Sequence, residues 1–453
     1  MNEQNGASVE DLRNILKGQV LLPGEPGFEA AAASWDLSVR QEVRAVAEIA
    51  DAHDAAAVVA HARRAGLGVA AQASGHGATT ALNGTILVRT GAMRGIEIDA
   101  DRSVARIEAG ARWGEIQAQA ARHGLTGLCG SAPVVSATGY LLGGGLSWFG
   151  RKHGLAAGSV RAAEIVDAEG VLRRVTQADD PELLWALRGG GGDFALVTAL
   201  EIDLYPASEL YGGRVIWPAA RASEVMAAFR RLTADAPDEL TAWFTLLNPP
   251  PSPDVPEALR GPLATIDVTY LGDPDKGREL TRILDSVPGV LSDGRGPLSP
   301  AEVGGICAEP ENPTPILYRS ELFGEFTEEA AGKLLDAAGH EGIAPLAMLQ
   351  VRHLGGALAR PVDGACGAMA EPYLLGMLGV TFAPELEEAV RARQEEIATA
   401  LEPHLSGRKP FTFLRSDGAA ADAFPAETLA RLRDVKRRRD PNGVFRSNFP
   451  VSD

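Results

Sequence analysis

The sequence has little cysteine and no long hydrophobic run. Its three cysteines, Cys129, Cys307 and Cys366, are odd in number and widely spaced among 453 residues, so they form neither a disulfide framework nor a CxxC metal pair. No segment has about 18 uninterrupted apolar residues, and the first residues lack a basic region followed by an apolar stretch. These absences predict a soluble, cytoplasmic protein without a membrane partner.

Basic side chains are fewer than acidic ones. The chain has 43 Lys and Arg against 60 Asp and Glu, a formal net charge of −17. Because nucleic acids and anionic lipid surfaces are bound through clustered Lys and Arg, this balance argues against both as partners. Lys436–Arg439 is a dense basic cluster in the last turn of a predicted helix, and we interpret it as a solvated helix end.

Several catalytic motifs are missing as well. No glycine run ends in Gly-Lys-Ser or Gly-Lys-Thr, and none gives GxGxxG between a strand and a helix. There is no HExxH, no histidine pair with ligand spacing and no GxSxG elbow. We therefore expect no metal site, no Rossmann-type cofactor site and no serine esterase chemistry.

What the sequence has in quantity is glycine, 51 residues, together with an ordinary 45% of hydrophobic residues. The length allows about two to three domains. Glycine-punctuated strands and helices extend to Pro206, longer elements follow, and the composition changes again near Ser406. In the first and last parts we predict strands at Val43–Ala50, Val69–Gln72, Thr85–Val88, Ile96–Ile98, Ala105–Ala109 and Phe411–Leu414, and helices at 54–66 with Asp54 as N-cap, 113–122 and 426–438.

The most informative loop follows the strand at Val69–Gln72. Its residues are Gln72, Ala73, Ser74, Gly75, His76, Gly77 and Ala78. Two glycines around a histidine permit positive φ angles and a close approach of the backbone to a ligand, so that successive N–H groups can bind an anion such as a pyrophosphate. The alternative is an ordinary turn with a structural histidine.

Two further glycine-rich segments come later in the chain. The second segment includes Gly130, Ser131, Ala132, Val135, Ser136, Gly139, Gly143 and Gly144. The third is Leu184–Thr198, which contains Gly189–Gly192 and Val197. Glycines in apolar surroundings leave few side chains to pack, which favours close approach to a ligand; the alternative is a tight crossing between elements.

Together these segments resemble the berberine bridge enzyme-like FAD-linked oxidoreductases of the bacterial type, within the vanillyl-alcohol-oxidase or PCMH-type FAD-binding superfamily. The order and spacing of Gly75-His76, of Gly130–Gly145 followed by His153-Gly154, and of Leu184–Thr198 carry the resemblance, together with Arg352–Ala357 and the tail 440–448 that ends in Asn448. It implies an α+β fold with a PCMH-type FAD-binding domain formed by N- and C-terminal parts (1–206 and 406–453). The substrate domain (207–405), an antiparallel sheet covered by helices, would be inserted between them.

The resemblance also implies how the cofactor is held. The family bonds FAD to the histidine of the first loop, so we expect an 8α-histidyl link at His76. Many relatives have a second link through a cysteine, but the matching position here is Ala132, and Cys129 lies three residues earlier. We therefore predict covalent FAD through His76 only, and the other glycine-rich residues above, with His153, Gly154, Val197 and Asn448, as its contacts.

The usual catalytic bases of the family are missing. Pro410 and Thr412 occupy the places of its Tyr-x-Asn motif, and Gly376 falls near the strand position where some relatives have a glutamate. We predict Tyr373 as the catalytic residue, because its strand should face the flavin. Tyr318 and Glu321 are further candidates, and His353 is more typical of core packing.

The resemblance predicts an FAD-dependent oxidase or dehydrogenase of a small-molecule alcohol, lactol, amine or sugar, with hydride transfer to flavin N5 and O2 or another acceptor reoxidising the cofactor. Because both usual bases are absent, an alternative is a redox-neutral cyclase or isomerase in which FAD shapes the pocket. A third alternative is a flavin-binding protein without activity.

Overall fold

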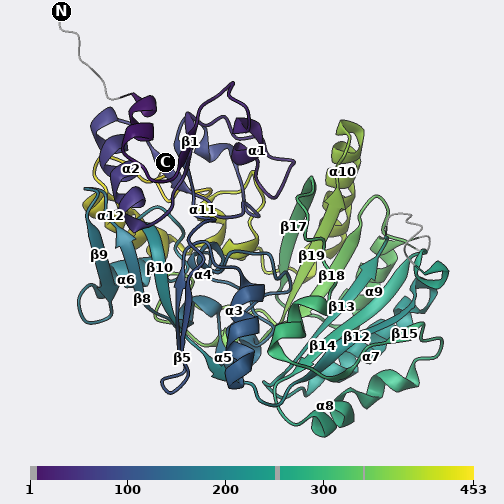
Figure 1. Ribbon diagram of the computed structural model, residues 1–453. Helices are drawn as coiled ribbons and strands as arrows, with labels where there is room; N and C mark the ends of the chain where they lie inside the picture. The colour runs from purple at the N-terminus through teal and green to yellow at the C-terminus, as the bar shows by residue number, and fades with distance from the viewer. Residues whose placement is uncertain (1–7, 250–255, 340–341, 453) are drawn as a thin grey trace, which may run out of the picture.

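The structure is a computed structural model that describes residues 8–249, 256–339 and 342–452 of the chain. Figure 1 shows two lobes. Lobe one combines the N-terminal elements, up to β11, with the C-terminal helices α11 and α12. Lobe two is formed by the middle of the chain, from β12 to α10. The C-terminal segment, yellow in the figure, therefore returns to the lobe that the N-terminal segment forms.

Lobe one contains two main sheets. The first has the order β1 (Gln19–Leu21), β2 (Ala45–Glu48), β4 (Ile86–Arg89), β3 (Val69–Ala71), with parallel pairing of β4 to β2 and β3. The second is antiparallel, in the order β5 (Ile96–Asp99), β6 (Val104–Glu108), β10 (Leu196–Asp203), β8 (Val160–Val166), β9 (Leu172–Thr176). A short pair joins β7 (Leu125–Thr126) to β11 (Tyr205–Pro206).

The helices of lobe one fill the space between and around these sheets. They are α1 (Phe28–Ala32), α2 (Ala52–Ala65), α3 (Trp113–Ala120), α4 (Ala137–Leu142), α5 (Gly150–His153), α6 (Pro181–Leu187), α11 (Ala420–Ala423) and α12 (Ala426–Arg439). Helix α2 packs Val58, Val59 and Ala62 against apolar residues of both sheets, among them Val166 of β8. One apolar face of α2 thus joins the two sheets into one lobe.

Lobe two is one large antiparallel sheet with helices. Its order is β15 (Ser292–Asp293), β12 (Tyr211–Pro218), β14 (Leu263–Tyr270), β13 (Leu240–Leu247), β18 (Met348–His353), β19 (Tyr373–Val380), β17 (Ile316–Phe323), and β16 (Gly296–Pro297) pairs with β12. Its helices are α7 (Ala222–Ala234), α8 (Pro274–Thr281), α9 (Glu328–Ala338) and α10 (Pro384–Leu401). Helices α7, α9 and α10 share an apolar core with one face of the sheet. Because side chains alternate along a strand, the other face remains for contact with lobe one.

The α+β class is confirmed, with an antiparallel sheet covered by helices inserted between the two parts of lobe one. We keep the division at residues 206 and 405 as a proposal. It is supported by the end of β11 at Pro206, the start of β12 at Tyr211 and the end of the last strand at Val380. No helix of the described residues is long and apolar enough to cross a membrane.

Two local predictions were wrong. The N-cap of α2 is Asp51, whose side chain accepts hydrogen bonds from His53 and Asp54 N–H, while the Asp54 carboxylate binds backbone N–H groups outside the helix, including that of Lys17. Residues Phe411–Phe413 form a 3₁₀ turn rather than a strand. Proline at 410 has no N–H for a strand ladder, and its carbonyl accepts from Phe413 N instead.

The basic cluster at the end of α12 is not simply solvated. The Lys436 ammonium is buried, forms an ion pair with Asp440 (Nζ–Oδ2 2.7 Å), and donates to the backbone carbonyls of Asp193 (2.7 Å) and Phe445 (2.8 Å). The Asp440 carboxylate accepts in turn from the N–H groups of Val444 and Phe445. These bonds attach the C-terminal tail to lobe one.

We predict that Lys436→Met lowers the free energy of unfolding by about 3–5 kcal/mol, because Asp440 would remain buried without its cation. The thermal midpoint of unfolding measures this loss. Arg437→Met is the control: its side chain is 68% exposed, and its replacement should change stability by less than about 0.5 kcal/mol. Equal midpoints for the two variants would contradict this role of Lys436.

Candidate functional site

A cavity of about 800 Å³ lies between the lobes. Lobe one contributes the loop after β3, residues of the segment 130–143 and the tail around Asn448; lobe two contributes β17, β18 and β19. The volume is within the range of about 300–1,000 Å³ that is typical of ligand pockets, and an interface between lobes is a common place for one. Apolar groups make up most of its wall.

Most of the residues predicted to bind the cofactor line this cavity. They are Gln72, Ala73, Ser74, Gly75, His76, Gly77, Gly130, Ser131, Ala132, Val135, Ser136, Gly139, Gly143, Val197 and Asn448. Ala78 is buried beside the first loop but does not line the cavity, and Gly144 lines a small neighbouring pocket. The three glycine-rich segments and the tail therefore meet in space.

The imidazole of His76 is held at one nitrogen and unbonded at the other. Its Nδ1 is 2.9 Å from Ser74 Oγ, and its ring stacks on Trp35 at 4.3 Å between centroids. Nε2 is buried and has no hydrogen-bond partner among the described residues. Burial, with a smaller effect of the Arg112 charge, lowers the pKa of His76 to about 4, so the ring is neutral at pH 7. Sequence reasoning missed Trp35, which carries no motif.

The first loop depends on a glycine at position 75. Gly75 has φ +86°, and a Cβ there would lie 2.8 Å from Cβ of Ser34. The loop is bonded to that neighbouring segment, because Trp35 N donates to Ser74 O (2.9 Å). A residue with a side chain would separate the two segments and move His76 from its stacking partner.

The tail fixes the other side of the same loop. Asn448 Oδ1 accepts a hydrogen bond from Thr79 N (3.2 Å), and Thr79 Oγ1 donates to Asn448 O (2.7 Å). Backbone bonds from Val69 N to Val444 O and from Arg446 N to Val69 O place the tail beside β3. The predicted return of the C-terminus therefore contributes directly to the cavity wall.

Cys129 lies outside the cavity lining, whereas Ala132 is part of it. The Cys129 thiol is buried and accepts a hydrogen bond from Gln117 Nε2 at 3.3 Å. Burial raises the pKa of this thiol to about 12, so it is not a nucleophile near neutral pH. This geometry agrees with the expectation that Cys129 is a structural thiol.

Two predicted contacts, His153 and Gly154, do not reach the cavity. The His153 ring packs on Tyr205 at 4.0 Å between centroids, and burial lowers its pKa to about 4. His153 is the last residue of α5 and Gly154 is its C-cap. The cavity lining therefore provides no argument for a contact between these two residues and a ligand.

The prediction that Tyr373 faces the cofactor was wrong. Its hydroxyl is 2.8 Å from Thr233 Oγ1 of α7, and its ring packs against Phe229 and Phe326, on the helix-covered face of the sheet. His353, its partner in the register of β18 and β19, lies on this face too. Successive side chains of a strand point to opposite faces of the sheet, and the prediction assigned Tyr373 to the wrong one of the two faces.

The cavity-facing side chains of lobe two include Tyr318 and Arg352. The phenol of Tyr318 is buried, and its hydroxyl has no hydrogen-bond partner among the described residues. A Cβ on Gly376 would collide with this hydroxyl. Tyr318 therefore occupies the space next to the position where the family resemblance placed a glutamate.

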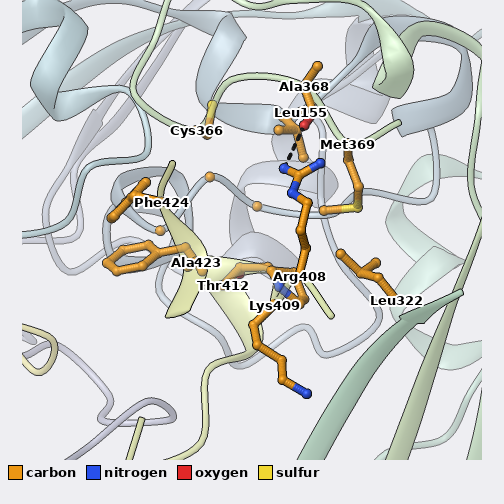
Figure 2. Close-up of a pocket in the computed structure, with 15 residues that line it drawn as sticks. Leu155, Leu322, Cys366, Ala368, Met369, Arg408, Lys409, Thr412, Ala423 and Phe424 are labelled. Carbon is orange, nitrogen blue, oxygen red and sulfur yellow. Dashed lines mark hydrogen bonds between the residues drawn. The ribbon is translucent and has the colours of Figure 1, made fainter. Parts of the chain in front are cut away.

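Two basic residues, Arg408 and Lys409, precede the Pro410-Phe411-Thr412 segment that stands in place of the family's Tyr-x-Asn motif, and both form ion pairs. Figure 2 shows Arg408 directed toward Ala368 and Lys409 pointing the other way, beside a pocket of about 30 Å³. Lys409 pairs with Glu321, whose buried carboxylate also accepts from Arg319 Nε at 2.8 Å. Glu321 is thus bonded to two cations and is not available as a base.

Comparisons with known proteins agree with this geometry. Residues 43–176 match the model of a family described as FAD binding domain. The chain is 27% identical to (R)-6-hydroxynicotine oxidase of Paenarthrobacter nicotinovorans over 96% of this chain and 97% of that protein. It is 30% identical to glucooligosaccharide oxidase of Sarocladium strictum over 41% of this chain and 38% of that protein.

Solved structures show the same architecture. The crystal structure of 6-hydroxy-D-nicotine oxidase from Arthrobacter nicotinovorans superposes with a TM-score of 0.80 at 26% identity, covering 96% of this chain and 98% of that one. The berberine bridge enzyme-like protein 1 of Physcomitrella patens gives 0.84 at 16% identity, covering 98% and 99%. The second likeness is one of fold, and the predicted PCMH-type FAD-binding fold is confirmed.

We predict that Gly376→Ala lowers stability by about 1–3 kcal/mol, because the added methyl group collides with the Tyr318 hydroxyl. In a Tyr318→Phe background the cost should be smaller, since the colliding oxygen is gone. Thermal unfolding of the single and double variants measures the coupling. Gly332→Ala in α9, where nothing lies within 4 Å, should stabilise instead by up to about 1 kcal/mol. If Gly376→Ala lowered the stability equally with Tyr318 and with Phe at position 318, the contact would be contradicted.

Proposed function

The chain is a berberine bridge enzyme-like FAD-linked oxidoreductase with the PCMH-type FAD-binding fold, and from this premise we propose that it oxidises a small-molecule alcohol, lactol, amine or sugar. The observation that carries the proposal is the cavity: the glycine-rich segments of lobe one line one side, and strands of lobe two, with Tyr318, Gln350 and Arg352 among apolar residues, line the other. Relatives named as oxidases of a hydroxynicotine and of an oligosaccharide support this range of substrates.

The residues present fit an FAD. Residues of 72–77, 130–132, 135–136, 139–140 and 142–143 line the cavity, many of them glycines or other small residues that leave room for a large ligand, and His76, whose Nε2 has no described partner, is in the same wall. When bound, the flavin supplies a hydride acceptor at N5, which O2 or another acceptor returns to the oxidised state. Contacts through backbone N–H groups reconcile a net charge of −17 with a pyrophosphate ligand.

We assign the covalent bond of the cofactor to His76 Nε2. Ser74 occupies Nδ1, and a neutral imidazole with Nδ1–H directed to Ser74 Oγ has its lone pair on Nε2. Ala132 has no nucleophile, and the Cys129 thiol is protonated and outside the cavity lining. These contacts support a single link, an 8α-histidyl bond.

A second candidate function is a redox-neutral cyclisation or isomerisation. The observation that favours it is the absence of both usual bases: Pro410 and Thr412 lie where the family has Tyr-x-Asn, and Gly376 where it has a glutamate. In that case the residues of lobe two would shape and orient a substrate without removing electrons from it.

Anaerobic mixing of the holoenzyme with a panel of alcohols, lactols, amines and sugars separates the two functions. We expect a member of the panel to bleach the absorbance of oxidised flavin, because oxidation delivers two electrons to the cofactor. Turnover of a substrate with an unchanged flavin spectrum would contradict the oxidase proposal and support the redox-neutral one.

The covalent bond is tested by intact mass after denaturation. We expect a flavin adduct in the wild-type chain and in Cys129→Ala, and none in His76→Ala. Ser74→Ala should lower the fraction of chains with an adduct, because the imidazole loses the partner that sets its tautomer. An adduct that persists in His76→Ala, or disappears in Cys129→Ala, would overturn the assignment.

A further inference from the structure

The guanidinium of Arg352 is buried between two aromatic rings in the cavity wall. Its side chain belongs to β18, its exposed fraction is 6%, and it lines the cavity. Cζ lies 4.1 Å from the ring centroid of Trp243 and 5.1 Å from that of Phe413. The two rings restrict the guanidinium and give partial compensation for lost hydration through cation–π attraction.

One edge of this guanidinium is fixed by a chain of hydrogen bonds. Arg352 Nε donates to Gln350 Oε1 at 2.6 Å, and Gln350 Nε2 donates to Thr245 Oγ1 at 3.0 Å. Thr245 and Gln350 are partners in the register of β13 and β18, so the chain is built on two paired strands. The orientation of Arg352 is therefore set by the sheet before any ligand binds.

The other edge has no partner in the described part of the chain. Neither Nη atom donates to a described group, and no described carboxylate is within ion-pair distance. Three other arginines of the cavity wall have carboxylate partners: Arg214 pairs with Asp267 (2.5 Å), Arg391 with Glu387 (3.0 Å) and Arg415 with Asp417 (2.7 Å). Arg446 also lines the cavity without an ion pair among the described residues, but its side chain is exposed, whereas that of Arg352 is buried.

Two buried phenols lie within the electrostatic reach of Arg352. Tyr140 comes from lobe one and Tyr318 from lobe two. Both residues line the cavity, and their hydroxyl oxygens are buried without a described hydrogen-bond partner. Burial raises the pKa of each phenol, an effect that the Arg352 charge opposes only in part. Both phenols therefore keep their protons at pH 7 and can donate to an anion.

We propose that Arg352, Tyr140 and Tyr318 form a subsite for a carboxylate of the substrate. A planar guanidinium with a free edge matches the two oxygens of a carboxylate, and the two phenols are further O–H donors in the residues of the same cavity wall. An anion there offsets the cost of a buried, unpaired cation. The proposal deepens the proposed function, on which it rests, by giving the class of substrate: a small molecule that carries a carboxylate.

Asp36 and Glu309 are acidic residues of the cavity wall that could oppose an anion in this subsite. The Asp36 carboxylate accepts from the backbone N–H groups of Ser38 and Ile316 and forms no ion pair with Arg352 among the described residues. The position of Glu309 is different. It is half-buried, and its charge acts on Arg214, Cys307 and Tyr318. It forms no ion pair with Arg352 among the described residues. Asp267 is already bonded to Arg214 through both carboxylate oxygens. Neither Glu309 nor Asp267 therefore forms an ion pair with the free edge of Arg352.

The test is calorimetric titration of the holoenzyme with two matched pairs, benzoate against benzamide and acetate against acetamide. We expect at least a tenfold preference for the carboxylate in one pair. Arg352→Gln should abolish that preference, and Arg352→Lys, which keeps the charge without the fork, should retain part of it. Tyr318→Phe and Tyr140→Phe should each weaken carboxylate binding about threefold to tenfold. Arg415→Gln is the matched control, because that arginine lines the cavity but has a carboxylate partner.

Three outcomes would overturn the subsite. They are the absence of a preference in both pairs, a preference that survives in Arg352→Gln, and an equal loss in Arg415→Gln. A loss of bound flavin in Arg352→Gln would also overturn it, since the arginine would then serve the cofactor. The titration involves no turnover, so a holoenzyme that binds carboxylates but whose flavin no substrate bleaches refutes the proposed oxidation and leaves the subsite standing.

Discussion

The buried ammonium of Lys436 is the contact on which the rest of the site depends. It joins α12 to the carbonyl of Asp193 in lobe one and, through Asp440, to the N–H groups at the start of the tail. The tail then lies beside β3 and brings Asn448 against the loop that holds His76. Because a buried charge is costly without its partners, these bonds form together or not at all. A chain segment more than 350 residues away along the sequence thereby closes the cavity around the first loop.

The two walls of the cavity use different chemistry. Lobe one contributes the glycine-rich segments, whose small residues leave room for a large planar ligand and whose N–H groups could bind phosphate despite a net charge of −17. Lobe two presents a sheet face with Tyr318, Arg352 and Gln350, whose side chains are fixed by paired strands. The glycine-rich segments that carry much of the family resemblance lie in the first wall, whereas in the second wall Arg352 alone belongs to such a segment. This division is usual when one scaffold serves many substrates.

The sequence predicted the local features of lobe one well because they are encoded locally. Strand β3, the loop with Gly75 and His76, and α2 ending at Gly66 follow from glycine placement and short-range periodicity. It failed where a residue's role depends on its surroundings. Tyr373 and Tyr318 both lie on strands of the same sheet. Tyr373 is on the face that the helices cover, and Tyr318 is on the opposite face, which lines the cavity. Lys436 looked like a solvated cation because the carbonyls that bind it come from elsewhere in the chain.

The sequence alone determined the three glycine-rich segments, the histidine of the first loop and the residues Pro410, Thr412 and Gly376, which stand where the family resemblance leads one to expect bases, because residue type and spacing within short segments carry that resemblance. Only the tertiary structure decided which titratable side chains reach the cavity. It removed Tyr373 and His153 from it, paired Glu321 with two cations, and left Arg352 buried without a carboxylate partner among the described residues. The physical reason is that contacts between segments distant in sequence decide which side chains are buried, which charges are paired and which face of a strand points to the cavity.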